Sequence, residues 1–200
     1  EVGGLAQESE DWSSLAAVYE GLLETRGAAD ELGLLRKALR LAHGKLQRKE
    51  DARRFAERIT ALAPDDEEAR AALESISQAE ERWADLLKLL HGREERAQEA
   101  SAKVELLLQI AQVEEEKVGD AAAASKTLQR ALEVEPKNRR VLTGLARLQE
   151  SLGDTAGLRE TLRRQIPLEV ADPRINLLLR LARLEAQSND VAAARSAYFE

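Results

Sequence analysis

Apart from its carboxylates, this sequence has few side chains that could do chemistry. His43 and His91 are the two histidines, and each is followed by glycine. A metal site needs about three or four converging ligands, and the two histidines form no HxxxH pair. The chain contains no cysteine, which excludes disulfides, thiolate metal sites and cysteine nucleophiles. We therefore expect each histidine to lie in a terminal helical turn, where it interacts with the helix dipole.

The carboxylates are numerous, and two runs of them stand out. Glu114, Glu115 and Glu116 are consecutive, and consecutive residues on a helix point in different directions. They therefore cannot share one cation, and we interpret them as a solvated helix face. The acidic run at 65–68 is typical of a first helical turn, where the dipole favours negative charge. No pair of carboxylates is marked by its context for acid–base catalysis.

Motifs for phosphate binding and nucleophilic catalysis are absent from the sequence. Neither GxxxxGK[ST] nor GxGxxG occurs, and GxSxG is missing too. We therefore expect no catalytic, cofactor-binding or metal-binding residue, and no enzyme activity. The net charge of −7 disfavours binding to nucleic acid, because backbone phosphates repel an acidic chain. No apolar run approaches the ~20 residues of a membrane span, so we expect no membrane insertion.

The apolar residues recur along the chain at the spacing of an α-helix, so helices must position the residues discussed above. Hydrophobic residues make up 44% of the chain and charged residues 34%, a balance that excludes a disordered tail. Apolar residues recur at i, i+3, i+4 and i+7 with charge on the opposite face. Three such stripes include the residues Leu106, Leu107, Ile110, Ala111, Leu142, Leu145, Ala146, Leu177, Leu178, Leu181 and Ala182. No segment alternates like a strand, and the pattern predicts an all-α fold.

The predicted turns recur at a regular interval. Gly119, Gly153 and Asn189 are each followed by Asp, and they lie 34 and 36 residues apart. Gly or Asn can take the left-handed position that ends one helix, and Asp can cap the next. Pro64 and Pro136, which are 72 residues apart, mark further helix boundaries. Helix-turn-helix units of this length indicate an α-solenoid.

Residues 105–138 resemble a tetratricopeptide repeat (TPR). In that family the first helix carries a large apolar residue and then a small one a turn later, a role that fits Leu107, Ile110 and Ala111. The turn, the second-helix packing positions and the terminal proline of the family match Gly119, Asp120, Ala124, Leu128, Ala131 and Pro136. One extra residue precedes the turn. Other parts of the chain match less completely.

The resemblance implies a right-handed α-solenoid of antiparallel helix hairpins over residues 1–200, a TPR-like superhelix. It divides the chain into a half repeat (1–30), four full repeats (31–66, 67–102, 103–138 and 139–173) and a partial repeat (174–200). Because both ends look cut and the chain lacks methionine, we expect a fragment of a longer protein. The excess of Arg over Lys suggests a bacterial coding sequence.

In TPR proteins the first helix of each repeat lines a concave face. Carried onto this chain, that rule predicts groove contacts at Arg36, Arg40, Gln112, Arg140, Arg147 and Arg183. Forked guanidiniums suit extended acidic peptides or carboxylates. The alternative is that these are ordinary solvated helix arginines. The asparagines of the carboxylate clamp that some TPR proteins use are not found at these positions.

The predicted function is a non-catalytic protein–protein interaction scaffold that presents a concave groove to a protein or peptide partner. One alternative is a structural or dimerising spacer of a larger protein, whose cut ends self-associate. Another is a regulatory domain attached to an enzyme. With no signal segment in this sequence, the expected location is the cytoplasm.

Overall fold

The computed structural model describes residues 12–25 and 31–187, and the described residues are helical, with no strand among them. This confirms the predicted all-α class. In chain order the elements are α2 (Trp12–Thr25), α3 (Glu31–Arg40), the π-helical turn η2 (Leu41–Lys45), α4 (Lys49–Leu62), α5 (Glu67–Ala79), α6 (Trp83–Arg96), α7 (Ala100–Val113), the π-helical turn η3 (Glu114–Val118), α8 (Ala121–Val134), α9 (Arg139–Ser151), α10 (Thr155–Gln165), the 3₁₀ turn η4 (Ile166–Leu168) and α11 (Ala171–Gln187).

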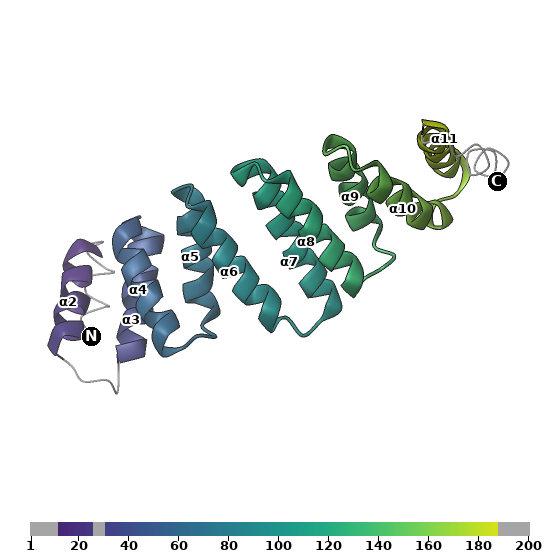
Figure 1. Cartoon of the computed structure of the whole chain (residues 1–200). Helices are drawn as coiled ribbons and strands as arrows, with labels where there is room; N and C mark the ends of the chain where they lie inside the picture. The colour runs from purple at the N-terminus through teal and green to yellow at the C-terminus, as the bar shows by residue number, and fades with distance from the viewer. Residues whose placement is uncertain (1–11, 26–30, 188–200) are drawn as a thin grey trace. The chain divides into compact units, whose positions relative to one another are not determined.

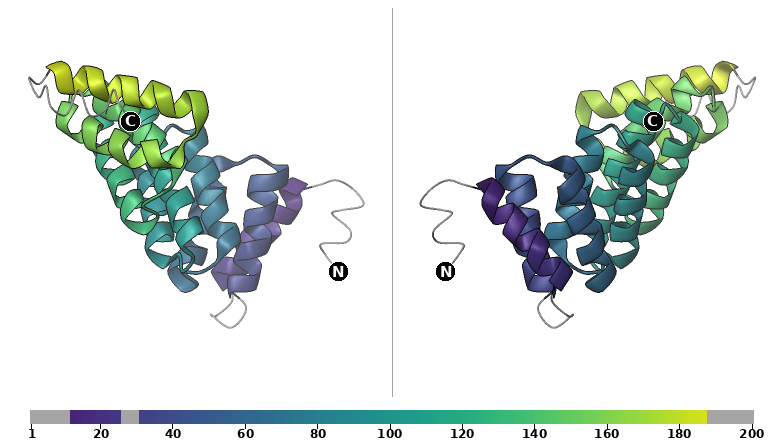
Figure 2. Two further views of the ribbon diagram at one scale, coloured as in Figure 1. Left: turned by 90° about the vertical axis from the view of Figure 1, so that its right-hand side faces the viewer. Right: turned by 90° about the vertical axis from the view of Figure 1, so that its left-hand side faces the viewer.

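The chain divides into two compact units, Glu1–Leu89 and Leu90–Glu200, which we call the N-terminal and C-terminal units. Within the N-terminal unit, α2, α3, α4 and α5 each pack on the next helix along the chain (Figure 1). Within the C-terminal unit the same holds from α7 to α11, and Figure 2 shows α11 in yellow beside the green α10. Each unit is by itself a stack of antiparallel helices, the arrangement expected of a solenoid.

The turns between helices have the chemistry that the sequence predicts. Gly119 has φ 79° and Gly153 has φ 70°, the left-handed conformation that favours glycine. Asp120 then caps α8 by accepting a 2.8 Å hydrogen bond from the amide of Ala123. Asp154 caps α10 in the same way, through the amide of Gly157 at 2.9 Å. The predicted turn at Asn189 lies outside the described residues, as do both ends of the array.

The extra residue before Gly119 is accommodated by a π-helical turn. In η3 the amide of Gly119 donates to the carbonyl of Glu114, five residues back, which closes a wider loop than an α-helical turn does. The N-terminal unit has the same device in η2, where the amide of Leu46 donates to the carbonyl of Leu41 at 3.0 Å. There Gln47, with φ 51°, takes the left-handed position that glycine holds elsewhere.

The small residues predicted at helix contacts are buried. Ala124 and Ala131 of α8 are 0% exposed, and they pack with Leu107 and Leu142 in one apolar cluster of the C-terminal unit. Ala146 and Ala182 belong to the next cluster along the chain, and Ala111 is buried beside α8. Because alanine lets two backbones approach closely, these positions hold neighbouring helices together and fix the walls of the site described below.

Candidate functional site

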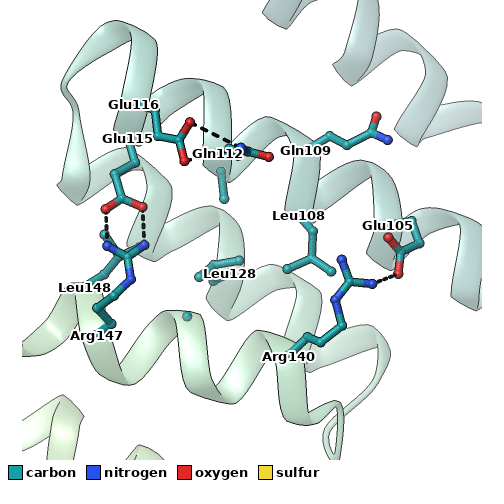
Figure 3. Close-up of a pocket in the computed structure, with 12 residues that line it drawn as sticks. Glu105, Leu108, Gln109, Gln112, Glu115, Glu116, Leu128, Arg140, Arg147 and Leu148 are labelled. Carbon is teal, nitrogen blue, oxygen red and sulfur yellow. Dashed lines mark hydrogen bonds and ion pairs between the residues drawn. The ribbon is translucent and has the colours of Figure 1, made fainter.

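A groove of about 460 Å³ runs between α7 and α9 in the C-terminal unit, and we call it the α7–α9 groove (Figure 3). Its floor is apolar. The floor is formed by Leu108 and Ala111 of α7, Leu128 of α8, and Gly144 and Leu148 of α9. A Cβ atom at Gly144 would lie 3.1 Å from Cδ1 of Leu128, so glycine lets the α8 side chain come up against α9.

Two ion pairs cross the groove, one near each end (Figure 3). Arg140 Nη1 of α9 donates to Oε1 of Glu105 on α7. Seven residues further along α9, Arg147 binds both carboxylate oxygens of Glu115, each at 2.5 Å. The hydrogen bonds from Arg147 hold the pKa of Glu115 below its ordinary value against the opposing effect of burial. The same bonds raise the pKa of Arg147. These pairs tie the two walls together.

The three consecutive glutamates before Gly119 point to three different partners. Glu114 turns inward, is 8% exposed, and accepts a 2.7 Å hydrogen bond from Oγ1 of Thr127 on α8. Glu115 binds Arg147 across the groove, as described above. Glu116 accepts two 3.2 Å hydrogen bonds from the amide group of Gln112. The interpretation of all three as a solvated helix face is therefore wrong for Glu114, because the π-helical turn points this side chain inward toward α8.

The N-terminal unit has similar ion pairs, which join α3 to the start of α5. Arg36 of α3 donates to Asp66 at 2.7 Å, and Arg40 binds both oxygens of Glu68 at 2.7 and 2.8 Å. Burial alone would raise the pKa of Asp66, but hydrogen bonds from the Ala69 amide and from Arg36 hold it below the ordinary value. These bonds stabilise the start of α5, which Asp66 caps.

The structure brings together three of the six predicted groove residues. Gln112, Arg140 and Arg147 line the α7–α9 groove, whereas Arg36 and Arg40 lie in the N-terminal unit. Arg183 is exposed on α11 and does not line this groove. Four of the arginines are engaged by carboxylates 28 to 35 residues away.

Sequence reasoning missed the carboxylate partners and the floor of the groove. The spacing of residues within one repeat did not identify Glu105 and Glu115 as partners of arginines one hairpin later. Gly144 carried a signal, because glycine inside a helix costs about 1 kcal/mol relative to alanine and so calls for a packing reason. Leu128 was recognised only as a packing residue, and its buried position beneath the groove depends on how α8 lies against α7 and α9.

His43 lies in the terminal turn η2, as expected, but His91 lies before the last turn of α6, so the terminal position predicted for it is wrong. Within residues 12–25 and 31–187, no three His, Cys, Asp or Glu side chains are grouped so that they could hold a metal ion. Trp12 is half-buried, and Nζ of Lys45 lies 5.3 Å from its ring centroid. None of the described helices is both long and apolar enough to cross a membrane.

Comparison with known proteins finds similar solved structures, but no protein family and no curated protein that matches by sequence. No protein-family profile and no curated protein matches the chain. Among solved structures, the chain is similar to YrrB, a TPR protein with an unusual peptide-binding site, at 13% identity and a TM-score of 0.48 over 91% of this chain and 89% of that one. It is also similar to a TPR protein from Parabacteroides merdae ATCC 43184 (12% identity, TM-score 0.44, 98% and 73% covered) and to Pseudomonas aeruginosa PilF (13%, 0.45, 94% and 89%). In the part of the chain that the structure describes, the fold is a series of antiparallel helical hairpins.

Proposed function

We propose that this chain is a non-catalytic protein-interaction module and that the α7–α9 groove binds an extended segment of a partner protein. The observation that carries the proposal is the groove's apolar floor, framed by two ion pairs that join its walls. An apolar centre with a polar rim is the usual anatomy of a protein interface. The volume of about 460 Å³ also falls in the range of ligand pockets, roughly 300–1,000 Å³.

The ion pairs support binding through preorganisation. A groove whose walls are already fixed loses little further freedom when a partner enters, so more of the contact energy appears as affinity. Arg147 and Glu115 have their charges matched in the free chain, and their side chains are ordered by two hydrogen bonds. In the floor, Leu128 and Leu148 are almost fully buried by their packing neighbours, so this part of the groove is fixed as well.

The arginines by themselves suggested an acidic partner. In the structure, however, the guanidiniums of Arg140 and Arg147 are already bound by Glu105 and Glu115. To bind Arg140 or Arg147, the carboxylates of such a partner would have to displace Glu105 or Glu115, or share the guanidinium with them. The two other functions, a dimerising spacer and a regulatory domain of an enzyme, stay hypotheses, since no specific contact among the described residues favours either.

Selection from a random peptide library on the 200-residue chain tests the proposal. Peptides that bind the groove should lose most of their affinity for Gly144→Leu, whose side chain would fill the floor. Gln109→Phe blocks the same groove from α7 and serves if Gly144→Leu folds poorly, because Gln109 is exposed there. The matched control is Ala122→Leu, at an exposed position of α8 outside the groove. Selected peptides that bind both groove variants as well as the parent chain would refute the proposal.

A further inference from the structure

The charges that line the α7–α9 groove are not balanced. Three carboxylates, Glu105, Glu115 and Glu116, face two guanidiniums, Arg140 and Arg147. Each guanidinium is paired with one glutamate, which leaves Glu116. Glu116 accepts hydrogen bonds from the neutral amide of Gln112 at 3.2 Å, and its charge also helps to raise the pKa of Arg147, which is already bound to Glu115. The surplus negative charge therefore lies at the η3 end of the groove.

This imbalance predicts the sign of the charge that the groove prefers. A cation at the η3 end gains attraction from Glu116 without breaking the bond between Arg147 and Glu115. An anion at the same place would approach Glu115 and Glu116, and could reach Arg147 only by competing with a carboxylate already bound through two hydrogen bonds. Like charges at close range are costly, whereas an added opposite charge needs no rearrangement of the groove.

The residue spacing along α9 indicates how far apart an apolar and a basic side chain of a bound segment should be. Gly144, at the floor, precedes Arg147 by three residues, or about 4.5 Å along the helix axis. In an extended peptide, side chains two residues apart point to the same face and are separated by about 6.6 Å. An extended segment that runs along α9 with an apolar side chain over Gly144 and Leu128 would carry the side chain two residues away toward the η3 end of the groove. Figure 3 shows Arg147, Glu115 and Glu116 at that end.

We propose that the α7–α9 groove selects an extended protein segment with an aliphatic or aromatic side chain and a lysine or arginine two residues from it. The apolar side chain lies on the floor formed by Leu108, Leu128 and Gly144, and the basic one reaches Glu116. This inference rests on the proposed function, and it specifies a basic partner where the arginines alone predicted an acidic one.

Three capped peptides of about nine residues test the inference, each with a serine background and a central leucine. The residue two positions after the leucine is Arg, Gln or Glu. The peptides are titrated into the ¹⁵N-labelled 200-residue chain, and NMR follows the amides of Gln112 and Gly144. We expect the Arg peptide to bind about two- to fivefold more tightly than the Gln peptide, the range of an exposed ion pair. The Glu peptide should bind most weakly, and added salt should reduce the advantage of the Arg peptide.

Variants at Glu116 show whether this residue makes the selection. Glu116→Gln should remove the advantage of the Arg peptide and leave binding of the Gln peptide unchanged, and Glu116→Lys should reverse the order to favour the Glu peptide. Glu133→Gln changes the net charge of the chain equally at an exposed site outside the groove, and should have no effect.

The outcomes separate this inference from the proposed function. If the Arg and Glu peptides bind equally well and both lose affinity for Gly144→Leu, the groove is a binding site and the charge selection is wrong. If the Glu peptide binds most tightly to the parent chain, the selection is also wrong. If none of the three peptides moves the amides of the groove, while library-selected peptides do, only the inference fails. If neither set binds there, both fail.

Discussion

Thr127 donates a 2.7 Å hydrogen bond from its hydroxyl to the buried carboxylate of Glu114, and this bond joins the two helices of one hairpin. The next hairpin repeats the arrangement with a neutral acceptor, where Thr161 donates to the side-chain oxygen of Gln149 at 2.7 Å. The sequence separation is 13 residues in the first pair and 12 in the second. The π-helical turn η3 accounts for the difference, because the extra residue is absorbed between Glu114 and Gly119.

Loss of the Thr127 hydroxyl should destabilise the chain. Thr127→Val keeps the shape of the side chain but leaves a buried carboxylate without its donor, at a cost of about 1–3 kcal/mol. Glu114→Gln should cost less, because Gln149 shows that an amide oxygen accepts the same bond. Urea unfolding followed by circular dichroism measures both. If Thr127→Val is as stable as the parent, the bond contributes nothing net.

Overpacking at Ala124 should lower stability more than the same change on the surface of α8. Ala124 is 0% exposed among Leu107, Leu128 and Leu142, so Ala124→Leu forces neighbouring side chains apart and costs about 1–3 kcal/mol. Ala122→Leu adds the same atoms at an exposed position of that helix and should leave the melting temperature nearly unchanged. Equal melting temperatures for the two variants would contradict the packing assigned to α8.

The buried carboxylate of Glu94 should make stability depend on pH. It is 2% exposed, with Nζ of Lys103 at 3.2 Å and Nη2 of Arg130 at 2.8 Å. Burial opposes ionisation, but the ion pair with Lys103 and the hydrogen bond from Arg130 hold the pKa of Glu94 below its ordinary value. A depressed folded-state pKa means that the contribution is full above the unfolded value of about 4.3 and is lost as pH falls through the folded value.

Glu94→Gln measures that contribution. At pH 7 the variant should be less stable by on the order of 1–2 kcal/mol, a value reduced because Lys103 and Arg130 keep partial contact with water. The difference should begin to shrink as pH falls below about 4.3, where the unfolded parent takes up a proton at this position, and should be lost below the lower pKa of the folded state, where the folded parent is neutral too. Urea midpoints measured across this pH range give the comparison. A stability difference that stays constant with pH would show that the ionised form of Glu94 is not the stabilising one.

Arg147 and Arg183 should differ in their effect on binding. Arg147→Ala removes one wall-to-wall bond of the α7–α9 groove, which should weaken binding of all three peptides, but it leaves Glu115 and Glu116 both without that cation, so the preference for the Arg peptide over the Gln peptide should increase. Arg183→Ala should change nothing, since Arg183 lies on α11 outside the groove. Both arginines are exposed, so each change should cost less than about 1 kcal/mol of stability. Equal effects of both substitutions on peptide affinity would contradict this assignment.

The sequence by itself determined the local structure of this protein. Apolar residues at helical spacing predicted the helices, and Gly119, Asp120, Gly153 and Asp154 marked the turns, because left-handed backbone and side-chain capping depend on adjacent residues alone. The small residues at helix contacts also followed from the repeated pattern. Even the extra residue before Gly119 was visible, although the π-helical turn that holds it was not.

Only the tertiary structure decided which charges meet. Arg147 and Glu115 are 32 residues apart, and Arg140 and Glu105 are 35 apart, so neither bond can be inferred from local spacing. Each bond depends on how far α9 is displaced along α7, which is set by the packing of Leu128 and its neighbours between them. With many carboxylates and arginines on the helix surfaces, several pairings fit the sequence equally well. The packing of the apolar faces selects one of them, and in doing so it leaves Glu116 as the unmatched charge of the groove.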